Sequence, residues 1–252
     1  MSIKIANQYG QLGAVYDEVM APVPYSDWVK YLRKIFKRYS FFPKSILDVA
    51  CGTGTVSLLL DEKGYFVTGI DLSETMIEAA NEKAKKCGST VEFICRNACD
   101  ITFDEEFDVA ISLFDSLNYI LSTTELKKAF IAVYNAIKPG GYFIFDLNSA
   151  HALSSNLFTQ DNFWDEDATV KHEWISSYNK KTKIATVDMT FYLPDGRTFA
   201  EVHKERVHEH FEVIDMLWSN GFEFVDAFHE YSFLPVGKRT ERIFYIAQKN
   251  VI

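Results

Sequence analysis

The sequence predicts an α/β protein with a doubly wound, mostly parallel β-sheet that carries an inserted antiparallel β-sheet. Between residues 44 and 148, short apolar runs alternate with longer amphipathic stretches, which is typical of successive right-handed βαβ units. Between residues 170 and 210, three runs instead alternate apolar and polar residues with a period of two, as antiparallel strands with one covered face do. The 252 residues suffice for one large domain that carries such an insertion.

Short runs of the first region are predicted strands of a sheet whose two faces are both covered. They are rich in β-branched and aromatic residues and show little polar alternation. These runs are residues 45–49, 66–70, 91–95, 107–112 and 142–146.

Amphipathic helices are predicted between these strands and ahead of them. Met76, Ile77, Ala80 and Ala84 keep near-helical spacing after Ser73, whose side chain suits an N-cap. Other predicted helices cover residues 56–60, 126–137 before the Pro-Gly-Gly at 139–141, and 28–39 after a cap at Ser26.

The inserted sheet is predicted from strands over residues 170–178, 184–193 and 198–210, joined by turns at 179–181 and 194–197. A helix over 211–220, ended by Gly221, and a strand pair over 223–231 and 242–248 then follow. The predicted organisation is therefore residues 1–148 as N-terminal helices and core, 149–210 as the insert, and 211–252 as elements that complete the core sheet.

Composition excludes several classes of protein. Apolar residues make up 48% and charged residues 24%, a globular balance that excludes a disordered or fibrous chain. The net charge of −9 disfavours nucleic acid as a partner. No apolar run approaches the roughly 20 residues of a membrane helix, and residues 1–10 lack a signal-peptide pattern. We therefore expect a cytoplasmic protein with no membrane partner.

Cysteine and histidine spacing predicts neither a metal site nor a disulfide framework. Cys51, Cys87, Cys95 and Cys99 form no CxxC pair, and the six histidines form no HExxH motif. Reduced thiols and no bound metal are the expectation.

A glycine-rich turn follows the first predicted strand and carries the strongest chemical signal. Gly52 and Gly54 allow the backbone to turn tightly and to approach a ligand at the carboxyl edge of the sheet. Asp71 ends the second strand, where an acid can accept both hydroxyls of a ribose. A dinucleotide fingerprint would place Gly or Ala where this chain has Ser57, which weakens the case for a nicotinamide cofactor.

Further polar residues follow the other strands at the same edge. Asp48 lies in an apolar strand end, where a buried carboxylate needs a cation or hydrogen-bond donors. Residues 97–101 and 113–119 follow the third and fourth strands, and the first of these loops could read a purine edge. No GxxxxGK[ST] phosphate loop occurs. The pattern therefore indicates a nucleoside ligand without phosphates.

These segments resemble those of class I S-adenosylmethionine-dependent methyltransferases over roughly residues 9–148. The segments are LDVACGTG at 47–54, GIDLSETMIEAA at 69–80, ACDI at 98–101, FDVAISLFDSLNYI at 107–120 and IKPGGYFIFDLNS at 137–149. The resemblance implies a seven-stranded Rossmann-like methyltransferase sheet and S-adenosyl-L-methionine as the cofactor.

The resemblance also implies a set of cofactor-binding residues. The methionine part of the cofactor, with its ammonium group, is assigned to Asp48, Ala50, Gly52, Gly54 and Leu113. The ribose is assigned to Asp71, and the adenine to Leu72, Met76, Asp100 and Ile101.

An aromatic N-terminal segment resembles the lid that small-molecule members of the family fold over the cofactor. Tyr9, Tyr16, Tyr25 and Trp28 are candidates to shield the sulfonium, because aromatic faces attract methylated cations.

The acceptor side of the site is predicted less fully. Asp115 and Tyr119 are candidates for a catalytic base, which is needed only when the acceptor carries a proton. Candidate substrate-binding residues are Asn118, Tyr119, His172, Tyr178, Tyr192, Arg206 and His208.

The function predicted from these features is transfer of a methyl group from S-adenosylmethionine to N or O of a small metabolite, by in-line displacement. Asp115-Ser116-Leu117-Asn118 stands where methyltransferases of nucleic-acid or glutamine amines have Asn/Asp-Pro-Pro-Tyr. With the net charge of −9 and the antiparallel insert, the best analogy is to methyltransferases of small molecules, such as glycine and nucleotide-sugar amine N-methyltransferases. A non-catalytic nucleoside-binding or scaffold module and a nicotinamide-dependent oxidoreductase are the alternatives. A homodimer is compatible with the sequence.

Overall fold

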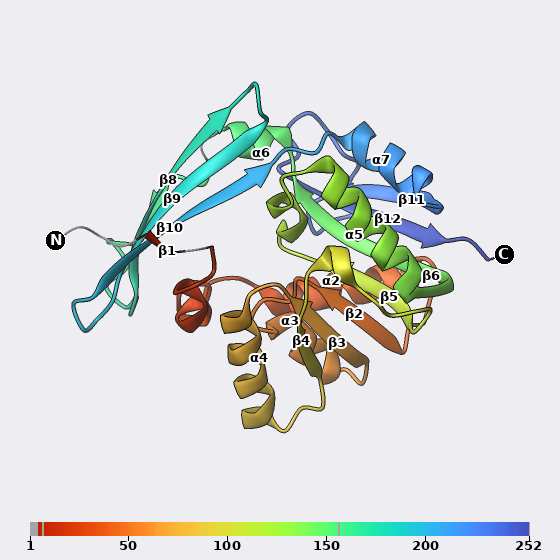
Figure 1. The fold of residues 1–252 in the computed structure, drawn as a ribbon, viewed down its shortest axis with the longest axis horizontal. Coiled ribbons are helices and arrows are strands. Elements are labelled where there is room, and N and C mark those ends of the chain that lie inside the picture. Colours follow the sequence, from red (N-terminus) through yellow and green to blue (C-terminus); the bar gives the residue numbers. More distant parts are fainter. Residues whose placement is uncertain (1–4, 7, 156, 252) are drawn as a thin grey trace.

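The protein contains two β-sheets, one flanked by helices and one projecting from it (Figure 1). The computed structural model describes residues 5–6, 8–155 and 157–251. The core sheet has the strand order β11-β12-β6-β5-β2-β3-β4, and the second sheet has the order β1-β10-β9-β8-β7. The predicted class, a doubly wound sheet with an antiparallel insertion, is confirmed.

Five parallel strands form most of the core sheet. Their bounds are β2 Ser45–Val49, β3 Phe66–Asp71, β4 Glu92–Cys95, β5 Phe107–Ser112 and β6 Ile137–Asn148. The register places Asp48 beside Gly69 of β3 and Ile111 of β5. The chain runs outward from β2 to β4 and then crosses to β5, so the strand order reverses next to β2. Ligands of doubly wound folds bind at such a switch point.

The strand β6 corrects one predicted boundary. We expected the preceding helix to extend to Ile137, but α5 (Thr123–Ala136) ends one residue earlier and β6 begins at once. Pro139 cannot continue a helix, and Ile137 is fully buried beside Phe107 of β5. The burial of Ile137 therefore extends the strand beyond the predicted residues 142–146.

Each face of the core sheet is covered by its own helices. The buried residues of α2 (Tyr25–Arg38), α3 (Thr55–Asp61) and α4 (Glu74–Cys87) pack on Ile46 and Ile144. The buried residues of α5 and α7 (His210–Ser219) pack on Leu47 and Phe145 of the opposite face. Because neighbouring strand residues point to opposite faces, both faces are apolar, as the near-continuous apolar strands predicted.

The last elements complete the core sheet. Strand β12 (Arg242–Lys249) pairs antiparallel with β6, and β11 (Phe222–His229) pairs antiparallel with β12. This pairing brings Arg242 beside Asn148, at the end of β6. Residues near the C-terminus thereby reach the edge where the glycine-rich turn lies.

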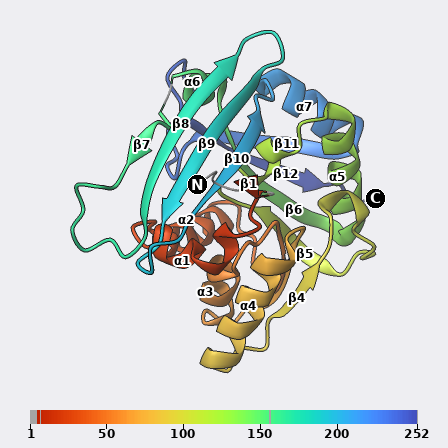
Figure 2. The same cartoon turned by 60° about the vertical axis from the view of Figure 1, so that its left-hand side comes forward.

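The projecting sheet holds the insert and one N-terminal strand (Figure 2). Its strands are β1 Ile5–Ala6, β7 Gln160–Asp161, β8 Lys171–Asn179, β9 Ile184–Tyr192 and β10 Thr198–Arg206. The third predicted strand, 198–210, is shorter in the structure, because β10 ends at Arg206 and the helix α7 begins at His210. Strand β1 pairs parallel with β10, a contact between distant parts of the chain that the sequence did not predict.

Short helical elements lie between the longer helices and strands. The turns η1 (Leu12–Ala14) and α1 (Tyr16–Val19) pack on the insert, where Leu12 is buried with Trp174 and Phe191. The others are η2 (Ala98–Asp100), η3 (Ser116–Tyr119) and α6 (Ala150–Ser154). Within residues 5–6, 8–155 and 157–251, no helix has the length and apolar character that crossing a membrane requires.

Candidate active site

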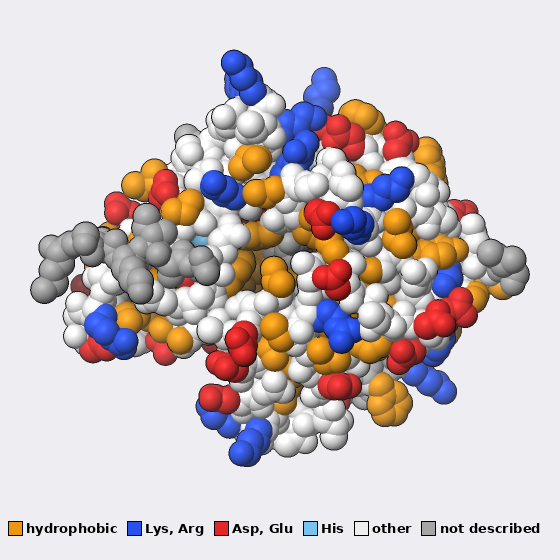
Figure 3. Space-filling model, in the orientation of Figure 1, with side chains coloured by type: hydrophobic (Ala, Val, Ile, Leu, Met, Phe, Trp, Pro, Cys, Tyr) orange, Lys and Arg blue, Asp and Glu red, His pale blue; other side chains and the backbone are white. Residues whose placement is uncertain are grey.

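A cavity of about 890 Å³ opens at the carboxyl ends of β2, β3 and β5. Figure 3 shows the surface hollowed between the projecting sheet and the core, with hydrophobic side chains along the hollow. Its volume lies within the range of about 300 to 1,000 Å³ that small-molecule sites occupy. We call this space the first cavity.

The glycine-rich turn forms one wall of the first cavity. Ala50, Gly52 and Gly54 all have positive φ angles, of 59°, 56° and 74°. A Cβ on Gly54 would lie 2.4 Å from the ring of Phe93, so this position has no room for a side chain. A Cβ on Gly52 would meet no atom within 4 Å, which leaves the backbone there open to a ligand.

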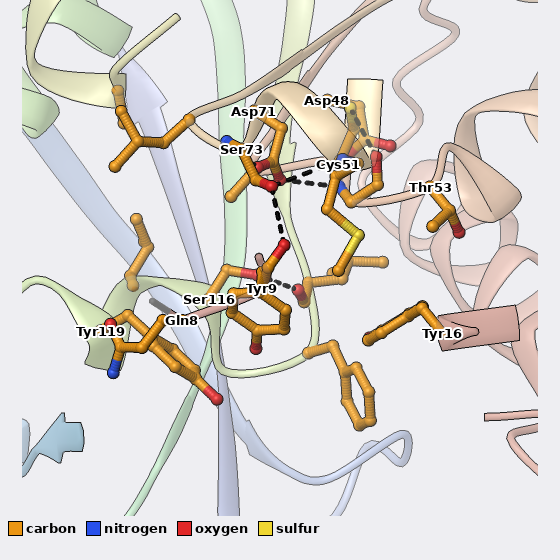
Figure 4. A pocket seen from close by; sticks show the side chains of 18 of the residues that line it. Gln8, Tyr9, Tyr16, Asp48, Cys51, Thr53, Asp71, Ser73, Ser116 and Tyr119 are labelled. Carbon is orange, nitrogen blue, oxygen red and sulfur yellow. Dashed lines mark hydrogen bonds between the residues drawn. The ribbon is translucent and has the colours of Figure 1, made fainter. Parts of the chain in front are cut away.

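Asp71 links this turn to the next helix. Its Oδ2 accepts a hydrogen bond from the Gly52 N–H at 2.8 Å, and its Oδ1 accepts one from the Ser73 N–H at 2.8 Å. Figure 4 shows Asp71 and Ser73 above Tyr9 in the cavity. Burial raises the pKa of Asp71, although these backbone N–H groups oppose the shift. Asp71 therefore fixes the wall on which a ribose would rest.

Asp48 is a buried carboxyl group that lines the same cavity, and few interactions offset the cost of burying its charge. Its Oδ2 accepts a hydrogen bond from the Ser57 hydroxyl at 2.5 Å. Burial raises the pKa of Asp48 to about 7, against the Ser57 hydrogen bond and together with repulsion from Asp71. A cation near Asp48 would lower this pKa, so the group suits a ligand that carries positive charge.

The N-terminal lid closes the first cavity and is tied to the core. Thr53 Oγ1 and Lys83 Nζ hold Asp17 of α1, at 2.6 Å and 2.7 Å. The carbonyl oxygen of Tyr9 accepts hydrogen bonds from the hydroxyls of Ser73 and Thr75. The ring of Tyr9 consequently stands in the middle of the cavity, between Tyr16 and Tyr119 (Figure 4).

Glu201 of β10 ties the lid to the insert. Its carboxylate, which is fully buried, accepts hydrogen bonds from the backbone N–H groups of Tyr9, Gln11 and Leu12 at 2.7 to 2.9 Å. It also lies 2.9 Å from His203 Nε2. One side chain thus positions both the lid loop and a histidine.

A second cavity of about 460 Å³ adjoins the first and lies between the lid, the insert and the end of β12. Four aromatic residues line both cavities, and we call them the aromatic wall: Tyr9, Tyr16, Phe114 and Tyr119. The two spaces therefore meet at one set of side chains.

Tyr119 of the aromatic wall is linked to Glu201 through His203. The Tyr119 hydroxyl lies 3.0 Å from His203 Nδ1, and His203 Nε2 lies 2.9 Å from Glu201. Because the carboxylate only accepts, a neutral imidazole donates from Nε2 and accepts the Tyr119 proton at Nδ1. Burial raises the pKa of Tyr119, so its phenol is neutral. The three groups can pass a proton away from the wall.

Phe114 and Asp115 reach the second cavity through a strained turn. Both have positive φ angles, 66° and 54°, which non-glycine residues rarely adopt. Their backbone N–H groups donate to the two oxygens of the buried Asp146 carboxylate, at 2.9 Å and 2.7 Å. Arg242 bridges Asp146 and Asp115, at 2.6 Å and 2.7 Å. This network offsets the strain and fixes one end of the aromatic wall.

The structure brings most predicted cofactor residues to the first cavity. These are Tyr9, Tyr16, Trp28, Asp48, Ala50, Gly52, Asp71, Leu72, Met76 and Leu113, together with Tyr25. Gly54 lies behind the turn, packed on Phe93. Asp100 and Ile101 do not line the cavity, and Asn97 and Ala98, just ahead of them, do. Arg96 also lines the cavity, and the position of Arg96 and Asn97 directly after β4 was the signal that could have found them.

The predicted acceptor residues are mostly placed elsewhere. Tyr119 and Asp115 line the second cavity. Asn118 is fully buried, and its amide bonds the backbone of Asn148 and Arg206, so it holds structure rather than a ligand.

The predicted insert residues line neither cavity. His172 is buried beside Trp174, and Tyr178 packs on the cluster of Leu153. His208 bonds the carbonyl of Ile120. Tyr192 and Arg206 lie on the sheet face opposite Phe199, Glu201, His203 and Glu205. Arg206 donates from Nη1 to the carbonyl of Leu121, so it contacts the core rather than a ligand.

Several polar residues that line the second cavity were not predicted from the sequence: Asn148, Gln160, His203, Glu205, Glu230, Glu241 and Arg242. His203 and Glu205 occupy alternate positions of β10, and this alternation with Glu201 was the available signal. Arg242 comes from a strand that is distant in the sequence and had no local signal.

The seven-stranded sheet with its covering helices is the fold of class I methyltransferases. Residues 46–141 match a family model described as "Methyltransferase domain". A protein named as a methyltransferase, YqeM of Bacillus subtilis (strain 168), is 32% identical over 246 residues, which cover 96% of this chain and 97% of YqeM. The chain belongs to the S-adenosylmethionine-dependent methyltransferase family.

Solved structures agree with this assignment. An S-adenosylmethionine-dependent methyltransferase from Clostridium acetobutylicum ATCC 824 superimposes with a TM-score of 0.84 at 30% identity, covering 97% of this chain and all of that one. The sugar N-methyltransferase KedS8 from Streptoalloteichus shares the fold, with a TM-score of 0.75 at 20% identity and 99% coverage of both chains.

We predict that the lid loosens when the Glu201 carboxylate is lost. Burial would raise the pKa of Glu201, but hydrogen bonds from His203 and from the N–H groups of Leu12 and Gln11 outweigh it and lower the pKa. The stabilisation of the lid by Glu201 is therefore complete above the ordinary pKa of glutamate, and it is lost as the pH falls through the lowered pKa of Glu201. Hydrogen exchange at Gln11 and Leu12 should accelerate at least tenfold in Glu201→Gln, and in the wild type at acidic pH.

The matched control is Glu173→Gln, which changes an exposed acid on the outer face of the same sheet. Its lid amides should exchange as in the wild type. Equal protection in all three proteins would contradict the assigned link between insert and lid.

Proposed function

We propose that the protein transfers a methyl group from S-adenosylmethionine, bound in the first cavity, to N or O of a small molecule bound in the second cavity. The observation that carries this proposal is the shared aromatic wall of Tyr9, Tyr16, Phe114 and Tyr119. Methyl transfer needs donor and acceptor to meet at one point from which water is excluded. Two cavities that meet at half-buried aromatic rings supply such a point.

The residues of the first cavity fit the cofactor part by part. The open backbone at Gly52 and the poorly compensated Asp48 suit a methionine with its ammonium group. Asp71 suits the ribose hydroxyls, and Leu72 with Met76 suits the adenine face. Asn97 and Ala98 take the adenine edge, in place of Asp100 and Ile101. When bound, S-adenosylmethionine supplies a methyl group activated by the positive charge on its sulfur.

The aromatic wall favours that positive charge and keeps the reacting atoms dry. Each ring that faces a cationic sulfur contributes ~0.5 to 2 kcal/mol of attraction. Tyr119 also receives the acceptor's proton as its own proton passes to His203, and Glu201 stabilises the resulting imidazolium. Asp115 is less suited to this task, because Arg242 already engages it.

The small-molecule nature of the acceptor is supported by the size of the second cavity and by two relatives. The cavity, about 460 Å³, is closed on one side by the insert. The relatives are the sugar N-methyltransferase KedS8 and the glycine N-methyltransferase of Rattus norvegicus, which is 26% identical over 59% of this chain and 57% of its own length.

Replacing Asp71 with Asn should weaken the binding of S-adenosylhomocysteine at least tenfold, because the carboxylate that holds Gly52 and faces the ribose loses its charge. Isothermal titration calorimetry measures the change. Asp100→Asn, an exposed acid outside the cavity, is the control and should stay within twofold of the wild type. Unchanged affinity in Asp71→Asn would refute the ribose assignment, and a folded wild type that binds no S-adenosylhomocysteine would refute the proposed function.

Replacing Tyr119 with Phe keeps the ring and removes the proton route, so kcat should fall about 100-fold while the affinity for S-adenosylhomocysteine stays within twofold. The value of kcat is measured from the transfer of a labelled methyl group to a compound that the wild-type protein methylates. His203→Gln should have a similar effect, and the double variant should be no slower than either single variant. Additive losses would mean that the two residues act separately.

A further inference from the structure

The second cavity contains more buried negative charge than its own residues compensate. Asp115 and Glu205 line it and are 8% and 4% exposed, and the fully buried Asp146, which does not line it, pairs with the same guanidinium as Asp115. Arg242 makes ion pairs to Asp115 at 2.7 Å and to Asp146 at 2.6 Å, so its charge is already shared by two carboxylates. Glu205 lines the same cavity from β10.

Glu205 has one neutral partner among the described residues. Its Oε2 accepts a hydrogen bond from Asn148 Nδ2 at 2.9 Å. Burial, together with repulsion from Asp115, raises the pKa of Glu205 to about 8, and burial raises the pKa of Asp115 to about 6 against the effect of Arg242. A buried carboxyl that lacks a cation retains a proton near neutral pH, and a cationic ligand would release it.

We propose that the second cavity binds a basic amine, whose ammonium group lies against Glu205 and Asp115 and supplies the missing positive charge. This inference rests on the proposed function and narrows it, because the methyl acceptor becomes a nitrogen compound. An anionic acceptor would instead meet four carboxyl groups that line the cavity, and Arg242 is already paired with Asp115 and Asp146. The four are Asp115, Glu205, Glu230 and Glu241.

The other residues that line the second cavity indicate which groups the rest of the ligand carries. Trp174 and Tyr231 line it, and each has a buried polar atom, Nε1 and Oη, without a hydrogen-bond partner in the described part of the chain. Buried polar groups are normally paired, so these two suit an oxygen atom on the ligand. The rings of Phe158 and Phe114 supply apolar surface. The amine therefore carries at least one hydroxyl, ether or carbonyl oxygen beside an apolar skeleton.

Calorimetry with matched probe pairs tests this proposal on protein saturated with S-adenosylhomocysteine. The pairs are glucosamine with glucose, and tyramine with 2-(4-hydroxyphenyl)ethanol, so that each amine has an alcohol of the same skeleton. In at least one pair the amine should bind tenfold or more tightly than its alcohol. Titration at pH 7 in buffers of different ionisation enthalpy should show that amine binding releases a proton.

Glu205→Gln should remove both the tenfold preference and the proton release, while the affinity for the alcohol stays within twofold. Glu173→Gln on the outer face of the insert should retain both properties. Equal binding of amine and alcohol in both pairs, or a preference that survives Glu205→Gln, would overturn the proposal. Failure to bind S-adenosylhomocysteine would instead refute the proposed function, so the two failures are distinguishable.

Discussion

The buried carboxylate of Glu201 is the contact on which the arrangement of the site depends. It holds the backbone of Tyr9, Gln11 and Leu12 in the lid and positions His203, which in turn reaches Tyr119. Glu201, a side chain of the insert, thereby positions two of the four residues of the aromatic wall: Tyr9 directly and Tyr119 through His203. A buried charge needs such a set of donors, so the lid cannot move without exposing an uncompensated carboxylate.

The core sheet and the insert divide the chemistry between them. The core supplies what a nucleoside needs: a tight turn at Gly52, an acid at Asp71 and a loop at Asn97. The insert and the last strand supply polar residues of the second cavity, which holds the acceptor in the proposed function, through His203 and Glu205 on β10 and Arg242 on β12. Asp146 joins the two halves, because it supports the strained turn of the core and also pairs with Arg242. The same core could serve other acceptors if the insert changed.

The sequence predicted the features that have local signals. The strands, the glycine-rich turn and Asp71 follow from composition and position, and the structure places them as expected. Within the predicted loop 97–101 it selected Asp100 and Ile101, whereas Asn97 and Ala98 line the first cavity, because a short turn has no periodicity that shows which of its residues face the cavity. It chose Arg206 and His208 over His203 and Glu205, because the inner face of β10 carries charged residues, against the usual apolar pattern. Arg242 and β1 required contacts between distant segments, which no local pattern encodes.

A crystal structure of the complex with S-adenosylhomocysteine tests the central claim, that the two cavities meet at the point of transfer, most directly. We expect the ligand to fill the first cavity with its ribose on Asp71 and its sulfur in contact with the rings of Tyr9 and Tyr119. The vacated methyl position should open into the second cavity. A sulfur atom directed away from the aromatic wall, or a ribose distant from Asp71, would contradict the account.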